Sequence, residues 1–428
     1  MQLQYDYLDY FGLIGYQSEY SEISNVKVEY NLKIQQYNSR AQGIMMGTMG
    51  IAGNISNIQI NNSNIQSHSF FGGLIGEMSN SNITVQDSKI QLNVVSTSNF
   101  LAGIVGYSDK SNINVNNLQI LNCSLSSQNF SGGVIGQVWE SKITLQNCNI
   151  SHSNISSIYY SGGYIGELAK SDLSIIQSFL SYNYHSTDEF YTGGFLGESY
   201  QSQINIVSSS LLQLLATSNN NFVAGIMGYT IESNIYVCDI LIQQCNFKSQ
   251  YFTGGLMGQT LQSNLTLDQC SVYQSNISGT YYCGGFIGYS SQQTLLIMQD
   301  SQISSSNIAS QNYSGGILGQ SWQSNITTIG CNISFCNIES TYYSGGYIGY
   351  SKSSDIIMDY FNIFITKILS QDNFGVILGY DDYNVINISN STSDQVMICQ
   401  QYMNIIILSI QYSCLHLINQ WSVSQCSI

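Results

Sequence analysis

Two glutamates one repeat apart form the most enzyme-like pair in the sequence. Glu167 and Glu198 occupy equivalent positions of consecutive repeats, so stacked β-strands would hold them ~4.8 Å apart. Two carboxylates at that separation raise the pKa of one of them, and retaining glycosidases use a pair spaced in this way. Any two acids in one column of a stacked repeat acquire this spacing, however, and other repeats carry Tyr or Gln there. We therefore interpret the pair as surface residues and keep catalysis as the alternative.

Other residues with reactive side chains are scattered along the chain. Asp172, His185, Asp188 and Glu189 lie close to the glutamate pair in the sequence. The four histidines form no HExxH motif, and the eleven cysteines show neither CxxC pairs nor zinc-site spacing. We therefore expect no metal site and no cofactor. Several cysteines replace Ser, Leu or Thr of other repeats, which indicates small packing residues.

Composition excludes several classes of partner. Ten Lys and Arg residues against 25 Asp and Glu give a net charge of -15, so we expect no binding to nucleic acid. The longest apolar run, 405–408, is too short to span a bilayer, and we expect no membrane insertion. Met1 is followed by neither a basic segment nor an apolar run, so no signal peptide is expected.

Repeats of one glycine motif must position these residues. The sequence Tyr-Ser-Gly-Gly-Tyr-Ile-Gly at 343–349 has thirteen related copies, and from Gly76 onward each step is 30 or 31 residues. A period of this size is typical of repeat architectures, in which each unit buries its apolar face against its neighbours. The last glycine of the motif recurs at Gly15, Gly47, Gly76, Gly106, Gly136, Gly166, Gly197, Gly228, Gly258, Gly288, Gly319, Gly349 and Gly379.

Alternating side chains within each repeat predict β-strands. Aliphatic residues with a polar residue between them follow each glycine motif, as at Ile143 and Leu145 or at Leu295 and Ile297. A step of two residues indicates a strand with one face in the core. A second strand is expected near Ile150, and the glycine motif supplies a third.

These patterns predict an all-β fold, a single-stranded right-handed parallel β-solenoid (β-helix) of about 13 coils of ~30 residues. Residues 1–69 are expected to form degenerate N-terminal coils or a cap, and residues 70–389 the regular repeats. Residues 390–428 are expected to form a degenerate C-terminal coil or cap, in which alternation extends to Trp421 and Val423.

An aromatic residue precedes the paired glycines in every regular repeat. In a parallel stack these rings would lie ~4.8 Å apart and could stack on one another, so we predict an internal aromatic spine. The column consists of Phe70, Phe100, Phe130, Tyr160, Tyr191, Phe222, Phe252, Tyr282, Tyr313 and Tyr343.

Two further aromatic columns predict a binding surface. If the spine points inward, strand alternation turns the residue just before each spine residue outward. The residue that follows the second glycine changes type together with this outward residue from repeat to repeat. The alternatives are an exposed aromatic stripe or ordinary surface tyrosines beside a second column that belongs to the core. The first column contains Tyr159, Phe190, Tyr251, Tyr281 and Tyr342, and the second contains Tyr164, Phe195, Phe286 and Tyr347.

The glycine motif resembles that of the GLUG-motif repeat family, most literally in Gly-Leu-Ile-Gly at 73–76 and Gly-Leu-Met-Gly at 255–258. The resemblance covers nearly the whole chain. It implies a β-solenoid of the kind found in large surface or secreted adhesin-like proteins, and it carries no catalytic residues. A location at the cell surface or outside the cell is expected from this resemblance alone.

We therefore predict a non-enzymatic structural or adhesive module that presents an elongated surface to a protein or glycan partner. The alternative is a polysaccharide-acting β-helix enzyme, either a glycosidase or a lyase, with Glu167 and Glu198 as its acids.

Overall fold

The computed structural model describes residues 2–4, 10–11, 14–17, 20–28, 33–35, 41–50, 52–67, 70–96, 99–364, 366–400 and 406–418. These residues contain strands and turns and no helix. They form stacked parallel coils of a β-solenoid with about 12 turns, which confirms the predicted fold class. Its handedness stays a prediction. The chain divides into two compact units, Met1–Asn219 and Asn220–Ile428, and each is described by itself.

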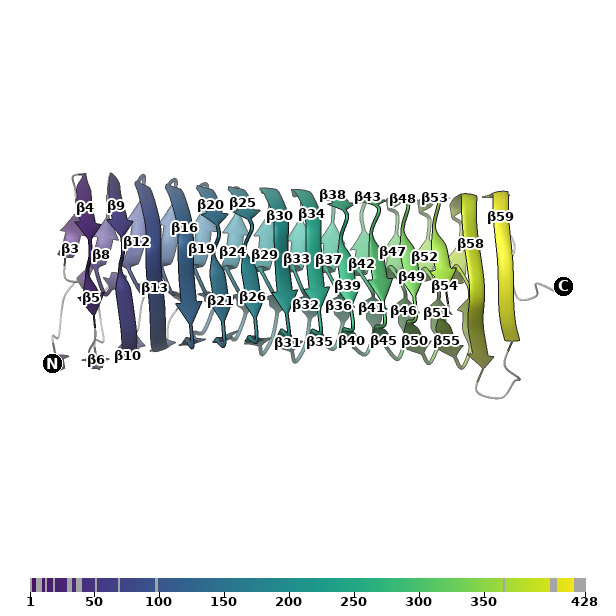
Figure 1. Ribbon diagram of the computed structural model, residues 1–428, viewed down its shortest axis with the longest axis horizontal. Coiled ribbons are helices and arrows are strands. Elements are labelled where there is room, and N and C mark those ends of the chain that lie inside the picture. Colours follow the sequence, from purple (N-terminus) through teal and green to yellow (C-terminus); the bar gives the residue numbers. More distant parts are fainter. Residues whose placement is uncertain are drawn as a thin grey trace. The chain divides into compact units, whose positions relative to one another are not determined.

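One coil of the first unit shows how the repeat folds. It contains β18 (Phe130–Gly132), β19 (Ile135–Trp139), β20 (Lys142–Gln146), β21 (Asn149–Ser151) and β22 (Asn154–Ser157). The glycine motif therefore forms two strands, β18 and β19, and the rest of the coil forms three more. The first strand belongs to a sheet that we call sheet B, the second to sheet C, and the last three to the broad sheet A. Figure 1 shows equivalent strands of successive coils side by side, for example β20 and β25 (Asp172–Ile176).

In the first unit, all three sheets begin in the N-terminal segment and continue through the regular repeats. Its other sheet B strands are β2 (Tyr10–Phe11), β7 (Ala41–Gly43), β11 (Phe70–Gly72), β14 (Phe100–Ala102), β23 (Tyr160–Gly162) and β28 (Tyr191–Gly193). Its other sheet C strands are β3 (Ile14–Gln17), β8 (Met46–Met49), β12 (Ile75–Ser79), β15 (Val105–Asp109), β24 (Ile165–Ala169) and β29 (Leu196–Tyr200). Its other sheet A strands are β1 (Gln2–Gln4), β4 (Ser21–Ser24), β5 (Lys27–Val28), β6 (Lys33–Gln35), β9 (Ala52–Ser56), β10 (Gln59–Ser67), β13 (Asn82–Ser96), β16 (Asn112–Leu121), β17 (Ser124–Ser126), β26 (Phe179–Ser181), β27 (Tyr184–Thr187), β30 (Gln203–Leu212) and β31 (Leu215–Ser218).

The second unit repeats this arrangement. Its sheet B strands are β32 (Phe222–Ala224), β36 (Phe252–Gly254), β41 (Tyr282–Gly284), β46 (Tyr313–Gly315), β51 (Tyr343–Gly345) and β56 (Asn373–Gly375). Its sheet C strands are β33 (Met227–Ile231), β37 (Met257–Leu261), β42 (Ile287–Ser291), β47 (Leu318–Trp322), β52 (Ile348–Lys352) and β57 (Leu378–Asp382). Its sheet A strands are β34 (Asn234–Gln243), β35 (Asn246–Lys248), β38 (Asn264–Asp268), β39 (Ser271–Tyr273), β40 (Asn276–Ser278), β43 (Leu295–Gln299), β44 (Gln302–Ser304), β45 (Asn307–Ala309), β48 (Asn325–Ile329), β49 (Asn332–Ser334), β50 (Asn337–Ser340), β53 (Asp355–Asp359), β54 (Asn362–Phe364), β55 (Lys367–Ser370), β58 (Val385–Gln400) and β59 (Ile406–Ile418).

The predicted aliphatic columns form the core. Ile143, Leu145 and Ile150 are buried, and the residues between Ile143 and Leu145 and on either side of them are at least partly exposed. The prediction is wrong at one coil, where Leu295 is 37% exposed and Leu296 and Met298 are buried in place of Leu295 and Ile297. The turn before β43 contains two successive left-handed residues, Gln292 and Gln293. This turn offsets the alternation by one residue, which turns the side chains of β43 to the face opposite to the expected one.

Small buried polar residues fix the corners of sheet A. Glu140 and Asn147 adopt left-handed conformations with φ of 46° and 52°, and each is followed by a buried residue, Ser141 or Cys148. The Ser141 hydroxyl accepts a hydrogen bond from the Ser111 amide (3.0 Å) and donates one to the Trp139 carbonyl (2.7 Å). Polar groups at the corners are thereby satisfied between coils.

Six cysteines follow a left-handed residue at these corners, as Ser141 does: Cys123, Cys148, Cys245, Cys270, Cys331 and Cys336. The Cys148 thiol donates to the Gln146 carbonyl (3.4 Å), and burial raises its pKa to about 12. Eight cysteines of the described part of the chain are free thiols, and all of them except Cys238 are buried. This confirms that these cysteines are packing residues.

The glycine pair allows a close approach of neighbouring coils. A Cβ atom on Gly133 would lie 2.2 Å from the Gly163 carbonyl oxygen and 2.6 Å from the Ile150 side chain. Neither Gly132 nor Gly133 has a left-handed φ, so lack of space explains the glycines.

The described C-terminal segment contains a parallel strand and an antiparallel strand. β58 pairs in parallel with three strands of the preceding coil, and β59 turns back and pairs antiparallel to β58. An antiparallel strand therefore follows the last parallel strand of sheet A (Figure 1). Residues 401–405 and 419–428, including the predicted alternation at Trp421 and Val423, lie outside the described residues.

Candidate functional site

The aromatic column lies on the outside of the corner between sheets B and C. In β23, Ser161 is fully buried and Tyr160 is partly exposed, and the same alternation recurs in β18 and β28. The expectation of an internal spine is therefore wrong. Phe222, at 9% exposure, is the only residue of this column that is buried. We call this column the aromatic ladder; it contains Phe70, Phe100, Phe130, Tyr160 and Tyr191 in the first unit, and Phe222, Phe252, Tyr282, Tyr313 and Tyr343 in the second.

The rings of the ladder stack on one another at the strand spacing. Phe100 and Phe130 are 5.0 Å apart between centroids with an interplanar angle of 3°. In the second unit, Tyr282 and Tyr313 are 5.0 Å apart at 4°. The faces of most rings are therefore occupied by neighbours, and the ladder presents ring edges and hydroxyl groups.

A second column, which we call the flanking column, packs against the ladder. The tight turn at the glycines returns the chain so that a side chain of sheet C meets the ladder, as in the contacts of Phe70 with Tyr107 (5.3 Å) and Phe252 with Tyr289 (5.0 Å). The flanking column contains Glu77, Tyr107, Gln137, Glu167 and Glu198 in the first unit, and Tyr229, Gln259, Tyr289, Gln320, Tyr350 and Tyr380 in the second. In the second unit it carries hydroxyl and amide groups without a charge.

The two predicted acids are neighbours in the flanking column of the first unit. Glu167 pairs in register with Glu198 on the adjacent strands β24 and β29. The Gln137 amide donates to the Glu167 carboxylate (2.7 Å), and the Tyr160 hydroxyl hydrogen-bonds to Glu198. Burial, followed by the charge of Glu167, raises the pKa of Glu198 to about 8. Burial also raises the pKa of Glu167. Burial therefore raises the pKa of both carboxyl groups, and that of Glu198 is raised further by its neighbour, Glu167.

Other reactive residues near the pair in the sequence are separated from it by the fold. His185 is fully buried in the core, where Nδ1 lies 3.3 Å from the Gly193 carbonyl oxygen and burial lowers its pKa to about 4. Asp172 is exposed at the start of β25 in sheet A. Asp188 accepts a hydrogen bond from the Asn219 amide (3.3 Å) at the surface, and Glu189 is also exposed.

The first predicted aromatic column is partly exposed and lies beside the ladder. Tyr159 stacks on Phe190 at 5.2 Å, and Phe190 lies 5.9 Å from Tyr160. Tyr251 stacks on Tyr281 at 4.9 Å and 5°, and Tyr342 is 46% exposed. Tyr159 and its equivalents precede the sheet B strands, so both this column and the ladder reach the surface in spite of strand alternation.

The second predicted column is in the core, so its assignment to an exposed binding stripe is wrong and the alternative of a core column is correct. Tyr164, Phe195, Phe286 and Tyr347 all have 0% exposure. Tyr164 packs against Phe195 at 5.1 Å and donates a hydrogen bond to the Cys148 carbonyl (2.7 Å). These four residues follow the glycine pair, where the turn directs them inward.

Sequence reasoning placed the flanking column at the surface but missed the ladder as a surface feature. The ladder was assigned to the core because its members are all aromatic. The position directly after each ladder residue could have shown that the ladder faces outward, because this position holds small or aliphatic residues, such as Ser161 and Thr192. Such residues suit the inside of a tight corner.

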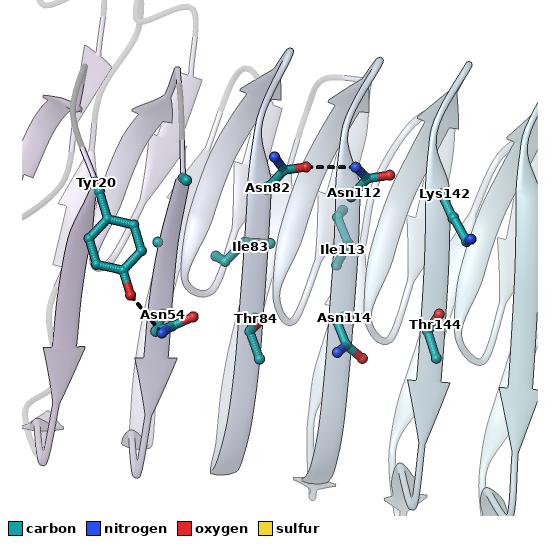
Figure 2. A pocket seen from close by; sticks show the side chains of 12 residues that line it. Tyr20, Asn54, Asn82, Ile83, Thr84, Asn112, Ile113, Asn114, Lys142 and Thr144 are labelled. Atoms are coloured by element: carbon teal, nitrogen blue, oxygen red, sulfur yellow. Dashed lines mark hydrogen bonds between the residues drawn. The ribbon is translucent and has the colours of Figure 1, made fainter.

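A shallow depression of about 470 Å³ lies on sheet A of the first unit. Its polar lining includes Asn54, Asn82, Asn112 and Lys142 (Figure 2). The Asn112 amide donates to Asn82 (2.7 Å), and the Asn54 amide donates to the Tyr20 hydroxyl (2.7 Å). These polar groups largely satisfy one another, and Tyr20 supplies the one aromatic ring among the described residues of the lining, in contrast to the stacked rings of the B–C corner.

Among the described residues, no three His, Cys, Asp or Glu side chains are grouped to hold a metal ion. No helix of the described segments is long and apolar enough to cross a membrane. Comparisons with family models, curated proteins and solved structures found no match to this chain. The resemblance of its glycine motif to GLUG-motif repeats stays a prediction.

Proposed function

We propose that the chain is a non-enzymatic adhesive module whose aromatic surface binds an extended carbohydrate. The observation that carries the proposal is that the ladder and the partly exposed aromatic column beside it, which contains Tyr159 and Tyr251, both stack in register over successive coils. Because equivalent groups recur at each strand, a ligand that itself repeats along its length can meet the same contacts several times.

The chemistry beside the ladder favours carbohydrate. In the second unit, the flanking column alternates tyrosine with glutamine from Tyr229 to Tyr350. Apolar ring edges beside uncharged donors and acceptors suit a sugar, which presents C–H groups and hydroxyls together. A protein segment is the competing occupant, and the experiment below distinguishes the two.

The test is to replace the exposed aromatic column and measure binding. Changing Tyr159, Phe190, Tyr251, Tyr281 and Tyr342 together to Ser should leave the β-sheet circular dichroism unchanged and abolish binding to a glycan array. A matched control changes Asn82, Asn112 and Lys142 of the sheet A depression to Ser and should keep binding. Undiminished glycan binding by the aromatic variant would contradict the proposal. Binding to host-cell proteins alone would assign the surface to a protein partner.

A second candidate function rests on the carboxylate pair. A glycosidase needs two carboxyl groups close together with different pKa values, and Glu167 and Glu198 lie in register on adjacent strands, where the pKa of Glu198 is raised to about 8. The purified chain would be incubated with a panel of polysaccharides and compared with the Glu167→Gln, Glu198→Gln double variant. Turnover that the double variant loses would establish an enzyme in place of the adhesive module.

We infer a location at the cell surface or outside the cell from the resemblance to adhesin-like repeats. Protease treatment of intact cells tests this location, because a surface protein is cleaved while the cell envelope stays closed. Protection of the chain until the cells are lysed would contradict it.

A further inference from the structure

The second unit contains a continuous array of tyrosine rings. Nine tyrosines form one connected network in which each ring has another within 6.5 Å between centroids. The array spans the exposed aromatic column, the ladder and the flanking column. Its members are Tyr251, Tyr281, Tyr282, Tyr289, Tyr313, Tyr342, Tyr343, Tyr350 and Tyr380.

Within the array, several tyrosines stack face to face on adjacent coils. Tyr282 and Tyr313 are 5.0 Å apart at 4°, and Tyr313 and Tyr343 are 5.1 Å apart at 7°. Tyr350 and Tyr380 are 5.3 Å apart at 1°. Parallel pairing of the strands holds the rings in register, so the two phenol rings of each pair lie face to face at about the strand spacing.

We propose that this array is a site of dityrosine formation between successive coils. A one-electron oxidant of the haem peroxidase class removes one electron and one proton from each of two stacked phenols. The two tyrosyl radicals join through the carbons ortho to their hydroxyls, and each of these carbons then loses its hydrogen as the phenols re-form. Two hydrogen atoms leave per cross-link and reduce one hydrogen peroxide to two waters.

The array also gives the oxidant access to the stacked rings. Tyr342 is 46% exposed and Tyr380 is 39% exposed, whereas the ladder tyrosines are only partly accessible. The ring centroids of Tyr342 and Tyr343 are 6.5 Å apart. The ring of Tyr380 is a neighbour of both Tyr343, at 5.3 Å, and Tyr350. A radical formed at either exposed ring therefore passes through ring contacts to a stacked partner.

Such a cross-link would lock neighbouring coils together. A bond between Tyr282 and Tyr313 closes one coil of the chain into a covalent loop, as a disulfide would, and restricts the unfolded state. The eight free cysteines of the described part form no such link. The inference does not depend on the ligand of the aromatic surface.

The test exposes the dilute, folded chain to a haem peroxidase and hydrogen peroxide. Peptide mass spectrometry should find Tyr282–Tyr313, Tyr313–Tyr343 or Tyr350–Tyr380 cross-links, each with the loss of two hydrogen atoms, in monomeric protein. In the chain unfolded by guanidinium, these cross-links should be lost while tyrosine oxidation continues.

A matched variant changes Tyr282, Tyr313 and Tyr343 together to Phe. Phe130 and Phe252 occupy equivalent ladder positions and stack in the same way, so the variant keeps the fold. It should lose the ladder cross-links and keep Tyr350–Tyr380. Cross-links confined to contacts between separate chains, or formed equally well in the unfolded chain, would overturn the proposal. Absence of dityrosine from the folded chain would overturn it as well.

Discussion

Tyr160 hydrogen-bonds to Glu198, which lies one coil further along the chain and in a different sheet. The contact joins the ladder to the flanking column and helps to hold a carboxyl group in a partly buried place beside a second carboxylate. Its consequences for stability can be measured directly.

We predict that Glu198 makes the chain less stable in alkali. Its folded pKa of about 8 lies above the ordinary 4.5, so the folded state binds more protons than the unfolded state between these values. The contribution of Glu198 to stability is therefore complete below pH 4.5 and is lost as pH rises through 8. Guanidinium unfolding at about pH 5 and about pH 9 should show this loss, and Glu198→Gln should reduce it. An equal loss in Glu198→Gln would contradict the assignment.

His185 should have the opposite effect. Burial lowers its pKa from 6.5 to about 4, so the unfolded state binds more protons in this window and stability falls as pH drops from 6.5 towards 4. His185→Ile, which introduces the residue that Ile155 supplies at the equivalent position of the preceding coil, should reduce this loss in thermal unfolding across the window. His152→Asn at an exposed corner serves as the control and should keep it.

The two aromatic columns on either side of the glycine pair should differ strongly in their effect on stability. Tyr164→Ala removes a fully buried ring and should cost about 3–5 kcal/mol in the free energy of unfolding. Tyr342→Ala removes a ring that is 46% exposed and should cost less than about 1 kcal/mol. Denaturant unfolding curves would give both changes in the free energy of unfolding from their midpoints, provided that the dependence of this free energy on denaturant concentration is unchanged. Similar costs would mean that the inner and outer columns are wrongly assigned.

The two glycines of a pair should tolerate alanine differently. Gly133→Ala brings a Cβ within 2.2 Å of a carbonyl oxygen of the next coil and should destabilise the chain by about 1–3 kcal/mol or more. A Cβ on Gly132 would lie 1.9 Å from the Ile135 carbonyl oxygen of its own turn, but Gly132→Ala should cost less, because Ala102 and Ala224 occupy the equivalent position and show that the turn can adjust. Thermal unfolding of the two variants would show which substitution is the more destabilising. A larger cost for Gly132→Ala would show that the first glycine of the pair is the more constrained.

The sequence alone determined the repeat, the parallel coils and most of the core. Ile143 and Leu145 could be placed inside because a period of two within a period of about 30 residues is compatible with few structures other than stacked strands. The register of Glu167 with Glu198 followed from the same repeat, because equivalent residues of consecutive coils must be neighbours.

Only the tertiary structure decided which aromatic column faces outward. Tyr160 and Tyr164 stand on opposite sides of one glycine turn, and that turn interrupts the strand alternation from which direction was predicted. The same limit applies at Leu295 and Leu296, where two successive left-handed residues moved the buried position by one. Alternation gives the side of each residue within a strand, whereas the backbone angles of the turn set how one strand is oriented to the next.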